Sequence, residues 1–79
     1  MMKKVEIYST ATCHYCVIVK DFLKDHGVDY VDYNVGTDLV KRKEMVELSG
    51  QMGVPVVKIG TDVIVGFNEE QIKSSLGLK

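Results

Sequence analysis

The chain has 79 residues, 46% of them hydrophobic, and its 10 basic and 11 acidic side chains give a formal net charge of −1. This length predicts one domain, residues 1–79, and the balanced charge gives no electrostatic basis for binding nucleic acid or an anionic membrane. The apolar runs are a few residues long, so no segment is expected to span a membrane. With two cysteines and no recognisable signal peptide, the protein is expected in the reducing cytoplasm, and a monomer is the default expectation.

The first half of the chain is predicted to form a strand, a helix and a second strand. Residues 3–8 alternate between apolar and polar side chains, as a half-buried strand does, and small residues follow, with Thr12 a candidate N-cap. A helix is predicted over residues 17–26, where apolar side chains recur at helical spacing, and Gly27 suits the position just after it. Residues 28–35, rich in Val and Tyr, predict the second strand.

The second half is predicted to form a helix, a hairpin and a last helix. The helix covers residues 39–49, and two short strands at 56–59 and 63–65 are joined by a Gly-Thr-Asp turn typical of a hairpin. The last helix covers residues 68–76, with Asn68 as its N-cap. The order βαβαββα predicts an α/β fold, with the first two strands parallel and the hairpin strands antiparallel.

The two cysteines, Cys13 and Cys16, carry the strongest functional signal. Two residues separate them, and the pair lies between the first predicted strand and the first predicted helix. A cysteine at a helix start faces unpaired backbone N–H groups and the positive end of the helix dipole, which favour the thiolate over the thiol. A strand–CxxC–helix context is typical of a dithiol redox site, and the carboxyl edge of a strand is where ligands bind in open α/β sheets.

Other roles for the cysteine pair were considered: a structural disulfide, a metal site and an unreactive pair. A loop this short removes little entropy from the unfolded chain, so a structural role is disfavoured. Zinc would need four ligands, and the candidates are Cys13, Cys16, His14 and His26. His14 lies inside the pair and His26 has no partner at the usual spacing, so redox chemistry is the favoured interpretation, without a metal or a cofactor. A metal site and an unreactive pair remain alternatives.

Four segments together resemble the glutaredoxins of the thioredoxin superfamily. They are Val-Glu-Ile-Tyr at residues 5–8, Thr-Cys-His-Tyr-Cys at 12–16, Gly-Val-Pro-Val at 53–56 and Val-Gly-Phe at 65–67. They occur in the order and at the spacing of that family and span essentially the whole chain. The resemblance implies a thioredoxin-like fold, in which a four-stranded mixed sheet of order 2-1-3-4 is flanked by three helices.

The resemblance also implies a thiol–disulfide oxidoreductase that reduces protein or small-molecule disulfides. Cys13 is expected to attack the target disulfide as a thiolate, forming a mixed disulfide. Cys16, one turn into the helix and more buried, is expected to attack that intermediate and release the reduced target. The protein is then left with a disulfide between its own two cysteines.

Seven further residues are implied to bind the substrate: His14, Tyr15, Val54, Pro55, Gly66, Phe67 and Asn68. In the family the bond before the proline that matches Pro55 is cis, and the backbone of Val54 would pair with a peptide substrate or glutathione; an ordinary trans turn proline is the alternative. The Tyr15 ring either lines the cleft or packs on the helix start, and Gly66 either approaches the substrate or forms a strand-end turn. His14, where the family usually has Pro, either faces solvent or favours the neighbouring thiolate as imidazolium.

Two electron donors are compatible with the resemblance: glutathione, and a flavoprotein of the thioredoxin-reductase type. The lysine that contacts glutathione in the family is Thr10 here, and the Gly-Gly-x-Asp segment is Val-Gly-Phe-Asn at residues 65–68. Gly66-Phe67 also resembles reductase-dependent proteins, in which an exposed aromatic ring could dock a partner. The flavoprotein is therefore the predicted donor and glutathione the alternative. An iron–sulfur cluster shared by two protomers, and a redox sensor without turnover, are alternatives of another class.

Overall fold

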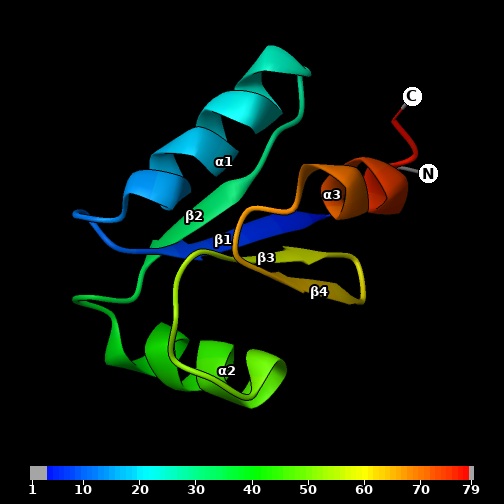
Figure 1. The fold of residues 1–79 in the computed structure, drawn as a ribbon. Helices are drawn as coiled ribbons and strands as arrows, with labels where there is room; N and C mark the ends of the chain where they lie inside the picture. Colours follow the sequence, from blue (N-terminus) through cyan, green and yellow to red (C-terminus); the bar gives the residue numbers. More distant parts are fainter. Residues whose placement is uncertain (1–3, 79) are drawn as a thin grey trace.

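A computed structural model describes residues 4–78, in which a four-stranded sheet carries helices on both faces (Figure 1). The strands are β1 (Val5–Ser9), β2 (Val31–Asn34), β3 (Val56–Ile59) and β4 (Asp62–Val65), and the helices are α1 (His14–Asp25), α2 (Leu39–Ser49) and α3 (Glu69–Leu76). The strand order is β2-β1-β3-β4; β1 is parallel to β2, and β3 is antiparallel to both β1 and β4. The expected α/β fold, element order and strand order are confirmed.

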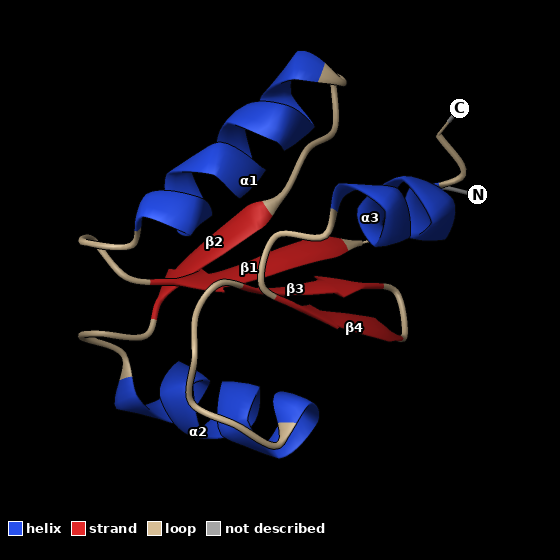
Figure 2. Cartoon of the chain, viewed as in Figure 1, coloured by secondary structure: helices blue, strands red, loops and turns tan. Residues whose placement is uncertain are grey.

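Strand β1 supplies side chains to both layers of the core. All five of its residues are buried, and because successive side chains point to opposite faces, it contributes to each layer. Helices α1 and α3 cover one face of the sheet and α2 covers the other (Figure 2). The layer under α1 and α3 contains Val5, Ile7, Val19, Leu23, Val57, Ile59, Ile64 and Ile72, and the layer under α2 contains Tyr8, Val35, Met45 and Val56.

A polar network attaches α2 to the sheet. The Tyr8 hydroxyl donates a hydrogen bond to Glu44 at 2.5 Å, and Lys41 Nζ lies 3.2 Å from the other carboxylate oxygen of Glu44 and 4.2 Å from the centre of the Tyr33 ring. Burial and the bonded carboxylate raise the pKa of Tyr8 above its ordinary range. The hydrogen bonds from Tyr8 and Lys41 lower the pKa of Glu44. The ionised form of Glu44 therefore stabilises the contact between α2 and the sheet.

The start of α1 differs from the sequence prediction. The helix begins at His14, three residues earlier than the hydrophobic pattern indicates, and its N-cap is Cys13 rather than Thr12. The Cys13 sulfur accepts a hydrogen bond from the backbone N–H of Cys16 at 3.2 Å. A cysteine thus takes the role that a Thr hydroxyl was expected to play, and the whole CxxC segment after Cys13 is helical.

Strand β2 is shorter than predicted, while the start of α3 agrees with the prediction. The N–H of Val28 bonds to the carbonyl of Leu23 at 2.9 Å, so this residue, predicted to begin the strand, instead closes the turn that follows α1. The side chain of Asn68 accepts the N–H of Gln71 at 3.1 Å, which confirms the predicted N-cap of α3. Residue 3, predicted to begin the first strand, lies outside the described residues.

Within residues 4–78, the helices lack the length and apolar character needed to cross a membrane.

Candidate active site

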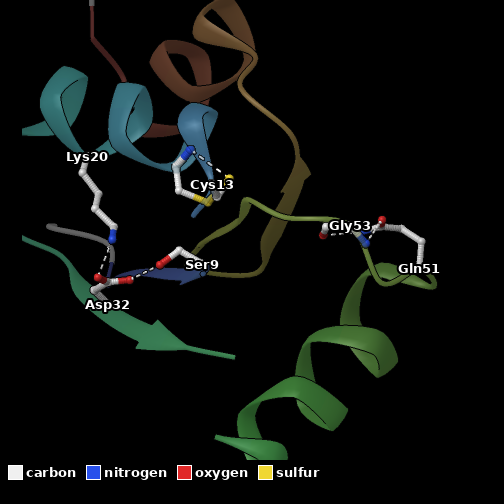
Figure 3. The surroundings of a disulfide bond; sticks show 7 residues. Ser9, Cys13, Lys20, Asp32, Gln51 and Gly53 are labelled. Carbon is white, nitrogen blue, oxygen red and sulfur yellow. Dashed lines mark hydrogen bonds and ion pairs between the residues drawn. A yellow bond between two sulfur atoms is a disulfide. The ribbon is translucent and has the colours of Figure 1, made fainter. Parts of the chain in front are cut away.

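Cys13 and Cys16 form a disulfide, so the structure represents the oxidised form of the dithiol (Figure 3). Cys13 has an extended backbone, with φ −82° and ψ 111°, and lies just before α1, whereas Cys16 lies in the first turn of the helix. Cys16 is 1% exposed and Cys13 is partly exposed. The two sulfurs therefore differ in access: a disulfide substrate approaching from solvent can reach Cys13 more easily.

The helix start favours negative charge on Cys13 once the pair is reduced. The N–H of Cys16 that bonds the Cys13 sulfur in the disulfide is available to the thiolate in the reduced form. The first turn of α1 contains no acidic side chain, so no carboxylate there opposes the charge or the helix dipole. These features are the ones expected to favour ionisation of Cys13, which stays a prediction.

The register of the sheet brings a second segment to the same edge. Because Tyr8 pairs with Val56 in antiparallel β1 and β3, Pro55 lies one step beyond, opposite Ser9 at the carboxyl end of β1. The peptide bond between Val54 and Pro55 is cis, as the resemblance implied. Segments about forty residues apart in the sequence, the CxxC loop and the Val-Pro segment, therefore meet at one edge of the sheet.

The segment after β4 completes this edge. Val56 pairs with Val65, and the N–H of Gly66 donates to the carbonyl of Pro55 at 2.8 Å. Gly66 has φ 77°, in the left-handed region that favours glycine, which supports its role as a strand-end turn. The side chain of Val65 is exposed beside this turn. The end of β1, the start of β3 and the end of β4 thus lie at the sheet edge where the CxxC segment begins.

The other predicted substrate-binding residues fall into two groups. His14 and Tyr15 are exposed in the first turn of α1, Tyr15 by 60%, so both are accessible to a bound molecule. Phe67 is only partly exposed, and its ring packs edge to face against Phe22, with 5.7 Å between ring centres. The expectation that Phe67 presents an exposed aromatic ring is therefore wrong. Asn68 is exposed, but its side-chain oxygen is used in capping α3.

A polar group next to the disulfide was not identified from the sequence. The buried Ser9 hydroxyl donates to Asp32 at 2.7 Å, and Lys20 Nζ lies 2.6 Å from the other oxygen of that carboxylate (Figure 3). The group joins α1 to β2 across the end of β1. No spacing in the sequence indicated it, because its members come from three elements whose pairing depends on the sheet.

The structure does not support the zinc alternative. His26 lies at the opposite end of α1 from the cysteines, where its Nδ1 is 2.9 Å from the carbonyl oxygen of Phe22. Among residues 4–78, no three His, Cys, Asp or Glu side chains are grouped closely enough to hold a metal ion.

The glutaredoxin family model matches residues 5–64, including both cysteines and the Val-Pro segment. The chain belongs to the glutaredoxin family. It is 48% identical to a glutaredoxin-like 8.6 kDa protein in the rubredoxin operon of Clostridium pasteurianum, over 86% of this chain and 91% of that protein. It is 35% identical to glutaredoxin 3 of Escherichia coli K12, over 86% of this chain and 82% of that protein.

Solved structures agree with this assignment. The thioredoxin-like protein BC3987 is 34% identical and superposes with a TM-score of 0.86 over 92% of this glutaredoxin and 100% of that chain. The glutaredoxin of Archaeoglobus fulgidus is 31% identical and gives a TM-score of 0.83 over 92% and 85% of the two chains. The protein is thus a thiol–disulfide oxidoreductase of the glutaredoxin family, with Cys13 and Cys16 as its cysteine pair.

Proposed function

We propose that Cys13 is the attacking nucleophile and Cys16 the resolving cysteine in the reduction of protein disulfides. The Cys13 thiolate attacks one sulfur of the target, the target S–S bond breaks, and one target thiolate leaves. Cys16 loses its proton and attacks the Cys13 sulfur, which releases the second target thiolate. Two electrons pass to the target, and the protein retains the Cys13–Cys16 disulfide. The observation that carries this assignment is the asymmetry of the pair: Cys13 is a partly exposed N-cap, and Cys16 is 1% exposed.

Backbone groups next to Pro55 support binding of an extended peptide. Among residues 4–78, neither the N–H nor the carbonyl of Val54 has a hydrogen-bond partner. An extended segment of a substrate protein can pair with these two groups as a neighbouring strand would. The exposed Tyr15 ring, in the first turn of α1, offers apolar contact to the same substrate.

A flavoprotein disulfide reductase is the proposed electron donor. Glutathione carries two carboxylates and an ammonium group, and the positions that would hold its charged ends are the uncharged Thr10 and Asn68. Asn68 already accepts a hydrogen bond from the backbone of α3, and Val65 places an exposed side chain where the family has a glycine. Single exposed charge contacts contribute less than about 1 kcal/mol, so it is the loss of both contacts together that disfavours glutathione. The partly buried Phe67 adds no support to this choice.

Single-cysteine variants test the proposed mechanism. Cys16→Ser is expected to accumulate a mixed disulfide with a peptide substrate, because the first exchange proceeds and the second cannot. Cys13→Ser is expected to form no adduct and to lose disulfide reduction. Mass spectrometry after exposure to the substrate measures both outcomes. An adduct trapped on Cys16 in the Cys13→Ser variant would reverse the two roles.

A direct comparison of donors tests the proposed source of electrons. The oxidised protein is mixed either with glutathione or with NADPH and a thioredoxin-reductase-type flavoprotein, and the loss of its disulfide is followed over time. We expect reduction through the flavoprotein to be the faster of the two. Rapid reduction by glutathione, with none through the flavoprotein, would establish the glutathione-dependent alternative instead.

A further inference from the structure

The side chain of Gln51 forms two hydrogen bonds with the backbone of one residue, Gly53. The N–H of Gly53 donates to Gln51 Oε1 at 2.5 Å, and Gln51 Nε2 donates to the carbonyl of Gly53 at 3.1 Å (Figure 3). One carboxamide therefore satisfies both polar backbone groups of Gly53, as a neighbouring strand would. We call this pair of bonds the Gln51–Gly53 clamp.

The clamp is anchored to the end of α2. Gln51 Nε2 also donates to the Ser49 hydroxyl at 3.2 Å. That hydroxyl lies 2.7 Å from the carbonyl oxygen of Met45 and 3.0 Å from that of Gln51, and its single hydrogen is shared between these two acceptors. The helix ends at Gly50, which has φ 73°. A continuous set of hydrogen bonds thus runs from the last turn of α2 to the residue just before Val54.

We propose that Gln51 is a positioning residue that orients the backbone of Val54 for pairing with a peptide substrate. The inference rests on the proposed function, in which Val54 is the pairing residue. With both backbone groups of Gly53 occupied by the clamp, the next residue, Val54, has an N–H and a carbonyl that are unpaired among residues 4–78, as are those of Met52 on the other side of Gly53. Since Val54 is joined directly to Gly53, a rotation of Gly53 would turn the pairing groups away from the substrate.

The clamp also accounts for glycine at position 53. A Cβ atom added there would lie 2.6 Å from Gln51 Oε1, closer than real side chains approach, and the flexible carboxamide would have to move. Gly53 does not have a positive φ, so its backbone accepts alanine without conformational strain. Gly53→Ala is therefore expected to act through displacement of the Gln51 side chain, and it should have little effect once that side chain is removed.

A double-mutant cycle tests the clamp. The rates at which Gln51→Ala, Gly53→Ala and the double variant reduce two disulfides are measured: a synthetic peptide dimer with mid-sequence cysteines, and dithiodipyridine, which has no peptide backbone. Each single variant is expected to reduce the peptide about three- to tenfold more slowly, the range for loss of a modest hydrogen-bonded constraint. The double variant should match Gln51→Ala, and dithiodipyridine should react at the wild-type rate throughout.

A structural readout and a matched control accompany the rates. Amide hydrogen exchange at Gly53 is expected to accelerate in Gln51→Ala, because the N–H loses its acceptor. Gln71→Ala is the control, since this exposed glutamine lies in α3 and takes no part in the clamp. It should leave the exchange and both rates unchanged. Urea denaturation verifies that each variant is folded.

Several results would overturn the proposal. Additive losses in the double variant would show that the two residues act independently. Equal slowing with both disulfides would place the effect on the cysteines, and unchanged peptide rates would remove the positioning role. If the wild-type protein reduced neither disulfide, the proposed function itself would fail. If it reduced both and the variants matched it, only the clamp would fail.

Discussion

The ionisation of Cys13 can be measured alone in the Cys16→Ser variant, which keeps the backbone N–H at position 16. A hydrogen bond from that N–H to a thiolate, at the 3.2 Å seen for the sulfur here, contributes about 1–1.5 kcal/mol at this partly exposed site. The positive end of α1 contributes about 0.3–1 kcal/mol more. Because the dipole charge is carried partly by the same N–H groups, the two contributions overlap, and about 1.4 kcal/mol is expected, which corresponds to an ionisation constant about ten times that of a free cysteine.

The rate of alkylation by iodoacetamide as a function of pH is the assay, because only the thiolate reacts. The midpoint should lie clearly below the value for free cysteine, about 8.5. A midpoint at or above that value would refute the argument that the helix start activates Cys13. It would also show that the hydrogen bond seen in the disulfide is not kept by the thiolate.

A charge placed in the first turn of α1 provides an internal check. His14 is exposed there, and the turn contains no acidic residue. His14→Glu should lower the ionisation constant of Cys13 about threefold, since an exposed like charge acts by under about 1 kcal/mol. His14→Gln is the matched control, because it removes the imidazole ring without adding a negative charge. Equal effects of the two substitutions would mean that charge is not the cause.

Two predictions concern stability. Tyr8→Phe removes the hydrogen bond to Glu44 and should lower the free energy of unfolding by about 1 kcal/mol at neutral pH. Because the pKa of Glu44 is lowered in the folded state, its contribution is present above the ordinary carboxyl value of 4.5 and is lost as the pH falls through the folded value. Wild type and variant should therefore converge in urea denaturation at acid pH, and a constant difference would contradict this reasoning. Leu23→Ala, at a fully buried position, should destabilise by about 2–5 kcal/mol, whereas Val40→Ala, at a position 77% exposed, should change stability by under about 0.5 kcal/mol.

The order of elements and the position of the cysteines could be predicted because their signals are local. Alternating apolar residues, hairpin turn residues and helix-ending glycines each act over a few positions, and the resemblance supplied the strand order. The start of α1 could not be predicted this way, because the run after Cys16 is β-branched and the N-cap is a sulfur atom. Thr12 satisfies the usual preference for an N-cap, yet it lies in the preceding turn.

The remaining features of the site depend on contacts between distant segments. The sequence suggested that Phe67 is exposed, but its ring, in the loop before α3, packs against Phe22 of α1. The hydrogen bond between Ser9 and Asp32 exists only because β1 and β2 pair in one register. The Gln51–Gly53 clamp is local, yet no rule of residue preference identifies a carboxamide that folds back onto the backbone two residues later. The hydrogen-bond geometry of a short loop can therefore be as hard to predict from the sequence as a contact between distant segments.

Selection between electron donors has to come from the surroundings of the cysteines rather than from the cysteines themselves. Both donors deliver electrons by thiol–disulfide exchange, so in the proposed mechanism the Cys13 sulfur would serve either one. Glutathione is small and depends on charged contacts at its ends, and this chain has uncharged residues at Thr10 and Asn68. A protein donor instead brings an extended backbone that can pair with Val54, whose polar groups are unpaired within residues 4–78. The same backbone pairing would then bind the substrate protein in the reduced form and the reductase in the oxidised form, one after the other at one edge of the sheet.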